Sequence, residues 1–321
     1  MDGSNNTFQP LHIPRDSEGY VKSFTLSSYN CSEAVEARAF FEQYGFVVIT
    51  NVFTPEQCAT TISDIWNVIE SFTGKSMRND ENQWISQNWY RTGLVQEGII
   101  GNASLWTRQI LLNRQISALH VAFAAILETE NLLVNHDRYG MFRPAKEHPK
   151  RVTMTNLHLD MNPWNYIDDK DNTQQIEALS ELQYKSDDDW IDENNEPGCA
   201  AVGELNVQGL VNLADNLEED GGFWLVPDDI PDMYAAACHI STRAGSAILW
   251  DQRTMHGSRA NASLRPRFAQ FFKMFPTQHP AMTLERAEYR CQAILAKLQE
   301  ANIDPNTDLT PLGRRIFGLL E

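Results

Sequence analysis

Cysteine is scarce in this chain, and the few cysteines follow no metal-binding or disulfide pattern. The 321 residues include five cysteines, and no two of them form a Cys-x-x-Cys pair. A disulfide framework requires an even, regularly spaced set, and a structural zinc site is usually rich in cysteine. The composition therefore argues against both scaffolds and favours a reducing, cytoplasmic setting.

Long apolar runs are also missing. The longest, such as residues 121–127, are far too short to span a bilayer. The polar N-terminus, MDGSNNTFQPLHIPRDSEGY, has neither the basic start nor the apolar centre of a signal peptide. We therefore expect an intracellular protein with no membrane partner.

Basic residues are outnumbered by acidic ones. Lys and Arg total 26 against 43 Asp and Glu, which gives a formal net charge of −17. Surfaces that bind nucleic acid are normally basic, so we expect no nucleic-acid partner. An acidic surface can attract a cationic substrate, but more commonly it keeps copies of a protein apart. The charge predicts a monomer or a weak homo-oligomer.

The rest of the composition, with 42% hydrophobic and 21% charged residues, is typical of a globular protein with a large core. Apolar residues at helical spacing indicate an α-helix at each end of the chain and others between. The predicted helices cover residues 32–44, 54–72, 104–129 and 283–301. The second begins with Thr54, Pro55 and Gln57, the pattern of a capping box with proline in the first turn.

Short β-branched and aromatic runs, closed by Gly, Pro and Asp, indicate strands. The predicted strands lie within residues 46–53, 131–142, 150–160, 204–215, 218–227, 245–251 and 267–275. Strands this dense are typical of a sandwich or barrel. The sequence therefore predicts an α+β fold with helices first, a β-rich centre and a final helix.

Two segments lack such periodicity. Residues 1–32 are predicted to form an extended, partly disordered N-terminal arm. Residues 165–198 form a long acidic stretch with scattered aromatics, which we interpret as a surface insertion such as a lid. The remainder, 33–321, is predicted to be a single domain that carries this insertion.

His158 and Asp160 stand two positions apart in a predicted strand, so their side chains project to the same side. An isolated pair of this kind is more often a satisfied polar contact than a site. His256, just after a later strand, supplies a second imidazole. Two imidazoles and one carboxylate form the facial triad that suits non-haem Fe(II) and leaves coordination positions open. The set favours a catalytic metal over closed structural zinc.

An Fe(II) centre that activates O2 needs further electrons, commonly from a co-substrate. Arg267 heads the last predicted strand, and alternation would turn Arg267, Ala269 and Phe271 inward. A guanidinium in an apolar pocket requires an anionic ligand, because an unpaired buried charge is costly. The distal carboxylate of 2-oxoglutarate fits this requirement. Arg265 has the same parity and is the alternative.

Several longer stretches resemble the phytanoyl-CoA dioxygenase family of Fe(II)- and 2-oxoglutarate-dependent oxygenases. They are FFEQYGFVVITNVFTPEQC (40–58), residues 105–144, VQGLVNLADNLEEDGGFWLVP (207–227) and HGSRANASLRPRF (256–268). Together they span most of residues 33–275. The resemblance implies a double-stranded β-helix, or jelly roll, with N-terminal helices against one sheet and a C-terminal helix.

By the same resemblance, His158, Asp160 and His256 would bind Fe(II), and Arg267 would anchor 2-oxoglutarate with help from Ser258. The implied reaction uses O2 to hydroxylate, desaturate or cyclise a small-molecule substrate, and it releases succinate and CO2. Because Asp160 is present, a halogenase, in which a smaller residue vacates that position, is disfavoured.

Asn162 and Trp164, just beyond the metal motif, are candidate substrate contacts. A turn and ordinary packing would explain them equally well. One departure concerns the loop VPDDIPDMY (226–234), which replaces the family's Pro-Gly-Ser-His-like turn and leaves the substrate open.

Two other functions remain possible. One is a catalytically silent jelly-roll module that binds or regulates. The other is a metal-dependent cupin-type enzyme that does not use 2-oxoglutarate.

Overall fold

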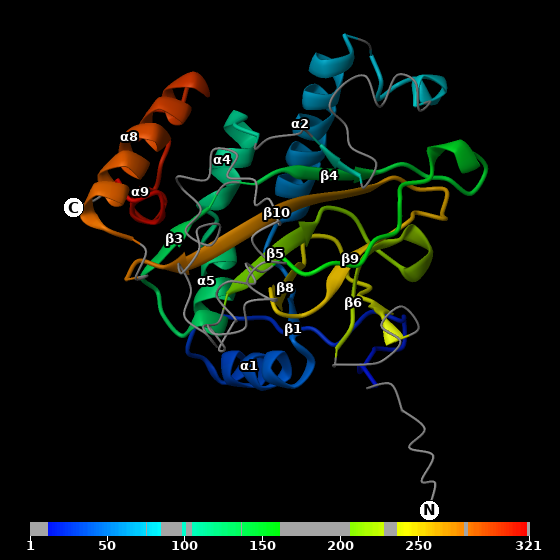
Figure 1. The fold of residues 1–321 in the computed structure, drawn as a ribbon, viewed down its shortest axis with the longest axis horizontal. Coiled ribbons are helices and arrows are strands. Elements are labelled where there is room, and N and C mark those ends of the chain that lie inside the picture. Colours follow the sequence, from blue (N-terminus) through cyan, green and yellow to red (C-terminus); the bar gives the residue numbers. More distant parts are fainter. Residues whose placement is uncertain are drawn as a thin grey trace, which may run out of the picture.

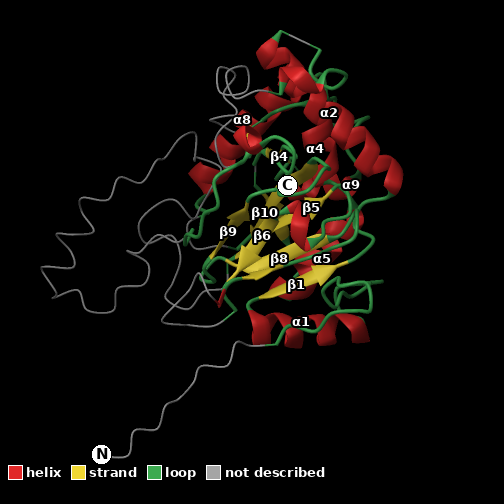
Figure 2. Ribbon diagram, turned by 90° about the vertical axis from the view of Figure 1, so that its right-hand side faces the viewer, coloured by secondary structure: helices red, strands yellow, loops and turns green. Residues whose placement is uncertain are grey.

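The structure is a computed structural model with two antiparallel sheets that face each other. It describes residues 12–74, 76–84, 98–100, 105–135, 137–160, 206–227, 236–278 and 282–319. Helices cover the outer face of the larger sheet, and the smaller sheet lies across its inner face (Figure 1, Figure 2). The predicted α+β jelly-roll class is confirmed. Within the described ranges the sheets are open and do not close into a barrel.

The larger sheet has the strand order β1-β8-β5-β10-β4-β2, with β3 paired to β10. Its strands are β1 (Phe46–Ile49), β2 (Ile99–Ile100), β3 (Leu132–Val134), β4 (Tyr139–Phe142), β5 (Val207–Asn212), β8 (Ala247–Asp251) and β10 (Arg267–Pro276). The smaller sheet has the order β7-β6-β9 and contains β6 (Gly222–Leu225), β7 (Cys238–His239) and β9 (His256–Arg259).

Six helices and three short 3-10 turns complete the described elements. They are α1 (Ser32–Tyr44), α2 (Pro55–Thr73), α4 (Arg108–Arg114), α5 (Ser117–Leu127), α8 (Leu284–Glu300), α9 (Pro311–Ile316), η1 (Glu81–Gln83), η3 (Pro149–Arg151) and η6 (Glu218–Asp220). The helices predicted over 32–44, 54–72 and 283–301 are confirmed. At the start of α2, Thr54 and Gln57 form the predicted capping box, with Pro55 in the first turn.

The prediction of a single helix over residues 104–129 is wrong. The chain forms α4 and α5, which meet at 49°. Ile116 takes an extended conformation between them. The Gln115 side chain accepts a hydrogen bond from the backbone N–H of Thr310 and donates one to the carbonyl of Asp308. The break therefore coincides with a tertiary contact to the C-terminal segment, which helical periodicity does not encode.

Two predicted strands also need correction. The segment 131–142 forms two strands, β3 and β4. After η3, residues 152–160 form no continuous strand, and this segment is joined to β9 by the bridge between His158 and His256 and by the hydrogen bond from the N–H of Asn156 to the carbonyl of Ser258.

The strands of the larger sheet turn alternate side chains to two different environments. On the outer face, the Asn113 side chain of α4 donates to Gln270 of β10 at 2.7 Å. Gly209 of β5 lies below Phe123 of α5, where a Cβ would be 3.0 Å from the ring. Arg267, at odd spacing from Gln270, points to the inner face instead. The inner face of this sheet is therefore one wall of the space between the sheets.

Residues 12–31 contain no helix or extended strand, and they pack against both sheets. Phe24 forms a bridge to Ile49 of β1, and its side chain is buried. Arg15 donates hydrogen bonds to the His239 carbonyl and to the Ser241 hydroxyl.

Across the described ranges, none of the helices taken singly has the length and apolar character needed to cross a membrane. The bent pair α4–α5 meets the criterion by length and composition. The apolar side chains of α5 are largely buried in the core.

Candidate metal centre

A two-residue bridge places His158 directly opposite His256. The N–H of His158 donates to the His256 carbonyl at 2.8 Å, and the N–H of His256 donates to the His158 carbonyl at 3.0 Å. Residues paired in this way across antiparallel strands project their side chains to the same face. The two imidazole centroids are accordingly 4.7 Å apart.

Asp160 completes the group from two positions beyond the bridge. Its carboxylate oxygens lie 3.4 Å from Nε2 of His158 and 3.6 Å from Nε2 of His256. One potential ligand atom from each of the three residues lies within 4.8 Å of the others. His256 is 5% exposed, whereas His158 and Asp160 are about half exposed, at 45% and 47%. The group is thus closed on the His256 side and open on the other.

The protonation states in this group suit a metal ligand set. Nδ1 of His256 is 2.9 Å from the carbonyl of Thr254. A carbonyl only accepts, so Nδ1 carries a proton, and Nε2 is the nitrogen of this ring that faces Asp160 and can serve as the metal ligand. Burial lowers the pKa of His158, which favours its neutral form. Burial alone would raise the pKa of Asp160, but His256 and His158 hold it below its usual range.

Aromatic side chains form the closed side of the group. The Trp250 ring is 5.2 Å from the His256 ring, and Phe223 stacks on His256 at 5.9 Å. The indole N–H of Trp224 donates to the carbonyl of Asn156, two residues before His158. These contacts fix His256 and the segment that carries His158.

Arg267 lies on the inner face of β10, beneath the smaller sheet. It is 3% exposed, and its guanidinium lies 4.6 Å from the Phe142 ring. Nε donates to Oδ1 of Asn212 at 3.0 Å. The two terminal nitrogens have no hydrogen-bond partner among the described residues. Burial lowers the pKa of Arg267 to about 9, so the side chain is still a cation at neutral pH.

Arg265, the alternative candidate, has a different environment. Its side chain is 52% exposed and forms a 2.6 Å ion pair with the buried carboxylate of Asp220. β10 begins only at Arg267, so strand parity does not extend to Arg265. Of the two arginines, Arg267 is the one whose buried terminal nitrogens have no acceptor among the described residues.

Ser258 lies on β9 two residues after His256, and alternation turns both side chains to the same face. Ser258 pairs with Phe223 on β6, and Leu225 on the same strand pairs with His256. Phe223 directly follows Gly222, whose backbone lies next to Arg267. Asn162, Trp164 and the predicted insertion 165–198 lie outside the described residues.

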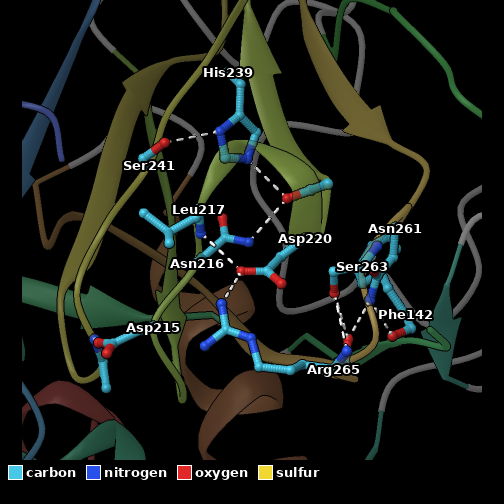
Figure 3. Close-up of polar contacts among 12 residues, drawn as sticks. Phe142, Asp215, Asn216, Leu217, Asp220, His239, Ser241, Asn261, Ser263 and Arg265 are labelled. Carbon is cyan, nitrogen blue, oxygen red and sulfur yellow. Dashed lines mark hydrogen bonds and ion pairs between the residues drawn. The ribbon is translucent and has the colours of Figure 1, made fainter. Parts of the chain in front are cut away.

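Two glycines bring the smaller sheet close to Arg267. Gly222 has a φ of +104°, and a Cβ there would be 2.4 Å from Nε of Arg267. The carbonyl of the preceding Gly221 accepts hydrogen bonds from Nε2 of His239 at 2.8 Å and from Asn216 at 2.9 Å. Figure 3 shows His239 and Asn216 in this polar network. Their hydrogen bonds fix the turn that leads into Gly222.

Sequence reasoning missed three residues that contact the candidate site residues. Asn212 holds Nε of Arg267, Gln208 donates to Asp160, and Trp250 packs against His256. A signal was present, because Gln208 and Asn212 are polar positions at even spacing in the otherwise apolar strand VQGLVN.

Comparison with known proteins identifies the family. The sequence profile of the family described as "Phytanoyl-CoA dioxygenase (PhyH)" matches residues 186–269. A Dictyostelium discoideum protein named "Putative phytanoyl-CoA dioxygenase" is 33% identical over an aligned length of 348 residues, gaps included. The alignment covers 96% of this chain and 97% of that protein. This chain belongs to the phytanoyl-CoA dioxygenase family. The membership indicates an oxygenase.

Solved structures support the fold of this family member. The "Putative Oxidoreductase from Salmonella typhimurium LT2" superimposes with a TM-score of 0.55 at 14% identity, covering 92% of this chain and 85% of that one. The GlcNAc-inducible gene 2 protein of Candida albicans has a TM-score of 0.53 at 13% identity, covering 88% of this chain and 75% of that one. At these identities the likeness extends to the fold alone.

The first prediction for this phytanoyl-CoA dioxygenase family member concerns Gly222. Gly222→Ala should lower the free energy of unfolding because it combines strain at positive φ with a clash against Arg267. Gly19→Ala is the matched control, since Gly19 has a φ of +87° and an added Cβ there would meet nothing within 4 Å. Positive φ alone costs about 1–2 kcal/mol. Urea denaturation should show a larger loss for Gly222→Ala, and equal losses would contradict the contact.

The second prediction concerns the buried side chain of His239. Burial lowers the pKa of this imidazole from 6.5 to about 4. Between these values the unfolded chain takes up a proton at this position and the folded chain does not. Stability should therefore fall as the pH decreases from 6.5 to 4, by up to about 1.4 kcal/mol per pH unit from this group. A glutamine side chain can still donate to Gly221 and does not titrate, so His239→Gln should flatten this slope in urea denaturation. If stability depended on pH equally in His239→Gln and in the unmodified protein, the lowered pKa assigned to His239 would be refuted.

Proposed function

We propose that this chain is an Fe(II)- and 2-oxoglutarate-dependent oxygenase that hydroxylates a small molecule and releases succinate and CO2. The observation that carries the proposal is the combination of two features. One is the His158, Asp160 and His256 group, with potential ligand atoms within 4.8 Å. The other is Arg267, a buried cation with two unpartnered terminal nitrogens among the described residues.

The donor set of the first feature fits ferrous iron. Two neutral imidazoles and one carboxylate are the ligands of the facial triad, and the set includes no thiolate that would favour structural zinc. The half-exposed side of His158 and Asp160 leaves room for further ligands. We expect these three side chains to hold the ion from one side only.

The second feature fits the distal carboxylate of 2-oxoglutarate. A guanidinium binds a carboxylate through two parallel N–H donors. Asn212 occupies Nε of Arg267, so the terminal nitrogens are the pair available for this purpose. The surrounding Phe142 and Gly222 offer no competing side-chain acceptor, because one has an aromatic ring and the other lacks a side chain. An anionic ligand would satisfy donors that are otherwise costly to bury.

The residues of the chain would divide the work as follows. When bound, ferrous iron and 2-oxoglutarate supply the O2-dependent oxidation chemistry. Arg267 orients the co-substrate by its far end, while Trp250 and Phe223 exclude water from the His256 side. The protein's contribution is therefore positioning and a dry wall on one side of the centre.

The proposal predicts that succinate forms when the purified protein is incubated with Fe(II), ascorbate, O2 and 2-oxoglutarate. Production should rise when a true substrate is added from a panel of small molecules, and His256→Ala should abolish it because the ligand set is then incomplete. Succinate can be quantified by mass spectrometry. Tight binding of metal and 2-oxoglutarate with no succinate from any panel member would support a silent binding module instead.

A second prediction separates 2-oxoglutarate dependence from cupin-type chemistry. Arg267→Met should weaken 2-oxoglutarate binding by about 100-fold, as expected for the loss of charged hydrogen bonds of roughly 3 kcal/mol. Arg265→Met is the matched control and should leave the affinity within a few-fold of the original, because Arg265 pairs with Asp220. Calorimetric titration of the Co(II)-loaded proteins measures both. Unchanged affinity in Arg267→Met would refute the assigned role.

A further inference from the structure

The Asp160 carboxylate is attached to the larger sheet through one glutamine. Nε2 of Gln208 on β5 donates to Oδ2 of Asp160 at 3.2 Å. Oε1 of Gln208 accepts from the indole N–H of Trp250 on β8 at 2.9 Å. Gln208 and Trp250 are direct partners in the β5–β8 register, so their side chains lie together on the inner face.

The direction of these hydrogen bonds follows from the chemistry of the two end groups. An indole N–H can only donate, and an ionised carboxylate can only accept. Gln208 must therefore turn its oxygen to Trp250 and its amino group to Asp160. The amide orientation, which distances alone leave ambiguous, is fixed by its neighbours.

The position of Asp160 explains why such a contact matters. Among the described residues, the His158–His256 bridge is the last backbone pairing of this segment with β9, and Asp160 lies two residues farther along the chain. Its side chain is about half exposed, so close packing does not hold it. In the described part of the chain, Gln208 is the residue outside the three-residue group that donates a hydrogen bond to this carboxylate.

Trp250 connects both kinds of ligand. Its indole is 4% exposed, and its ring lies 5.2 Å from the His256 ring while its N–H holds Gln208. One buried side chain thus fixes an imidazole by packing and, through Gln208, a carboxylate by hydrogen bonding.

We propose that Gln208 is a positioning residue that orients Asp160 for metal binding, and that Trp250 locks Gln208 in the required orientation. The inference rests on the proposed function, because it assumes that Asp160 is a metal ligand. Outer residues that orient a ligand typically change metal affinity by about 10- to 100-fold when they are replaced.

The test measures the dissociation constant for Co(II), used as the probe for the ferrous ion, by visible absorption and tryptophan fluorescence. Gln208→Met, which keeps the length of the side chain and removes the amide, should weaken Co(II) binding by about 10-fold or more. Gln109→Met is the matched control, because Gln109 donates to Asn113 on α4, away from Asp160. It should bind Co(II) as the unmodified protein does.

Trp250→Phe separates the hydrogen bond from the packing, since it keeps an aromatic ring and removes the N–H. It should weaken Co(II) binding less than Gln208→Met does. The double variant, Gln208→Met with Trp250→Phe, should bind Co(II) about as weakly as Gln208→Met alone, because the indole N–H acts through the amide. Additive losses would overturn the role given to Trp250.

Two readouts keep positioning apart from simple destabilisation. The thermal unfolding midpoint of metal-free Gln208→Met should stay close to that of Gln109→Met, while its increase on adding Co(II) should shrink. If Gln208→Met binds Co(II) as tightly as the original protein does, while His256→Ala abolishes binding, the role given to Gln208 is wrong. The proposed metal site would still stand. Absence of Co(II) binding by the original protein would overturn both.

Discussion

The pair of backbone hydrogen bonds between His158 and His256 is the constraint on which the candidate site depends. It sets the register between the segment that carries His158 and Asp160 and strand β9. A slip of one residue would turn one imidazole to the opposite face. The side chain of Asn156 accepts from the N–H of Ser258, and Trp224 donates to the carbonyl of Asn156, so side chains reinforce the same register.

The two sheets supply different parts of the site. The larger sheet contributes the buried cation Arg267 and the residues that support it and Asp160. The smaller sheet contributes His256 and, at Gly222, a backbone that approaches the guanidinium closely. Because the carboxylate of Asp160 is half exposed and Arg267 is buried, the positive charge lies deep and the negative charge lies near the opening.

Much of this arrangement follows from local sequence rules. The start of α2 and the end of α1 at Gly45 have clear capping signals. The His-x-Asp spacing places His158 and Asp160 on one side, and the alternation from Arg267 predicts its inward direction. These features depend on neighbours in the chain or on strand geometry, so the sequence alone contains them.

Other features depend on contacts between distant segments. The break between α4 and α5 coincides with the contact of Gln115 to the C-terminal segment. The choice between Arg265 and Arg267 depends on where Asp220 lies, which strand parity does not reveal. The polar pattern of β5 marks Gln208 as unusual, but its partners come from two other segments.

Arg15 ties the N-terminal arm to the surroundings of Arg267. It donates to the backbone carbonyl of His239, whose imidazole in turn holds the Gly221 turn against Arg267. A protein shortened to begin at residue 33 would lose this clamp together with the Phe24 bridge to β1. Shortening the chain at that end would therefore loosen the Gly221 turn that packs against the Arg267 guanidinium, although every proposed iron ligand would still be present.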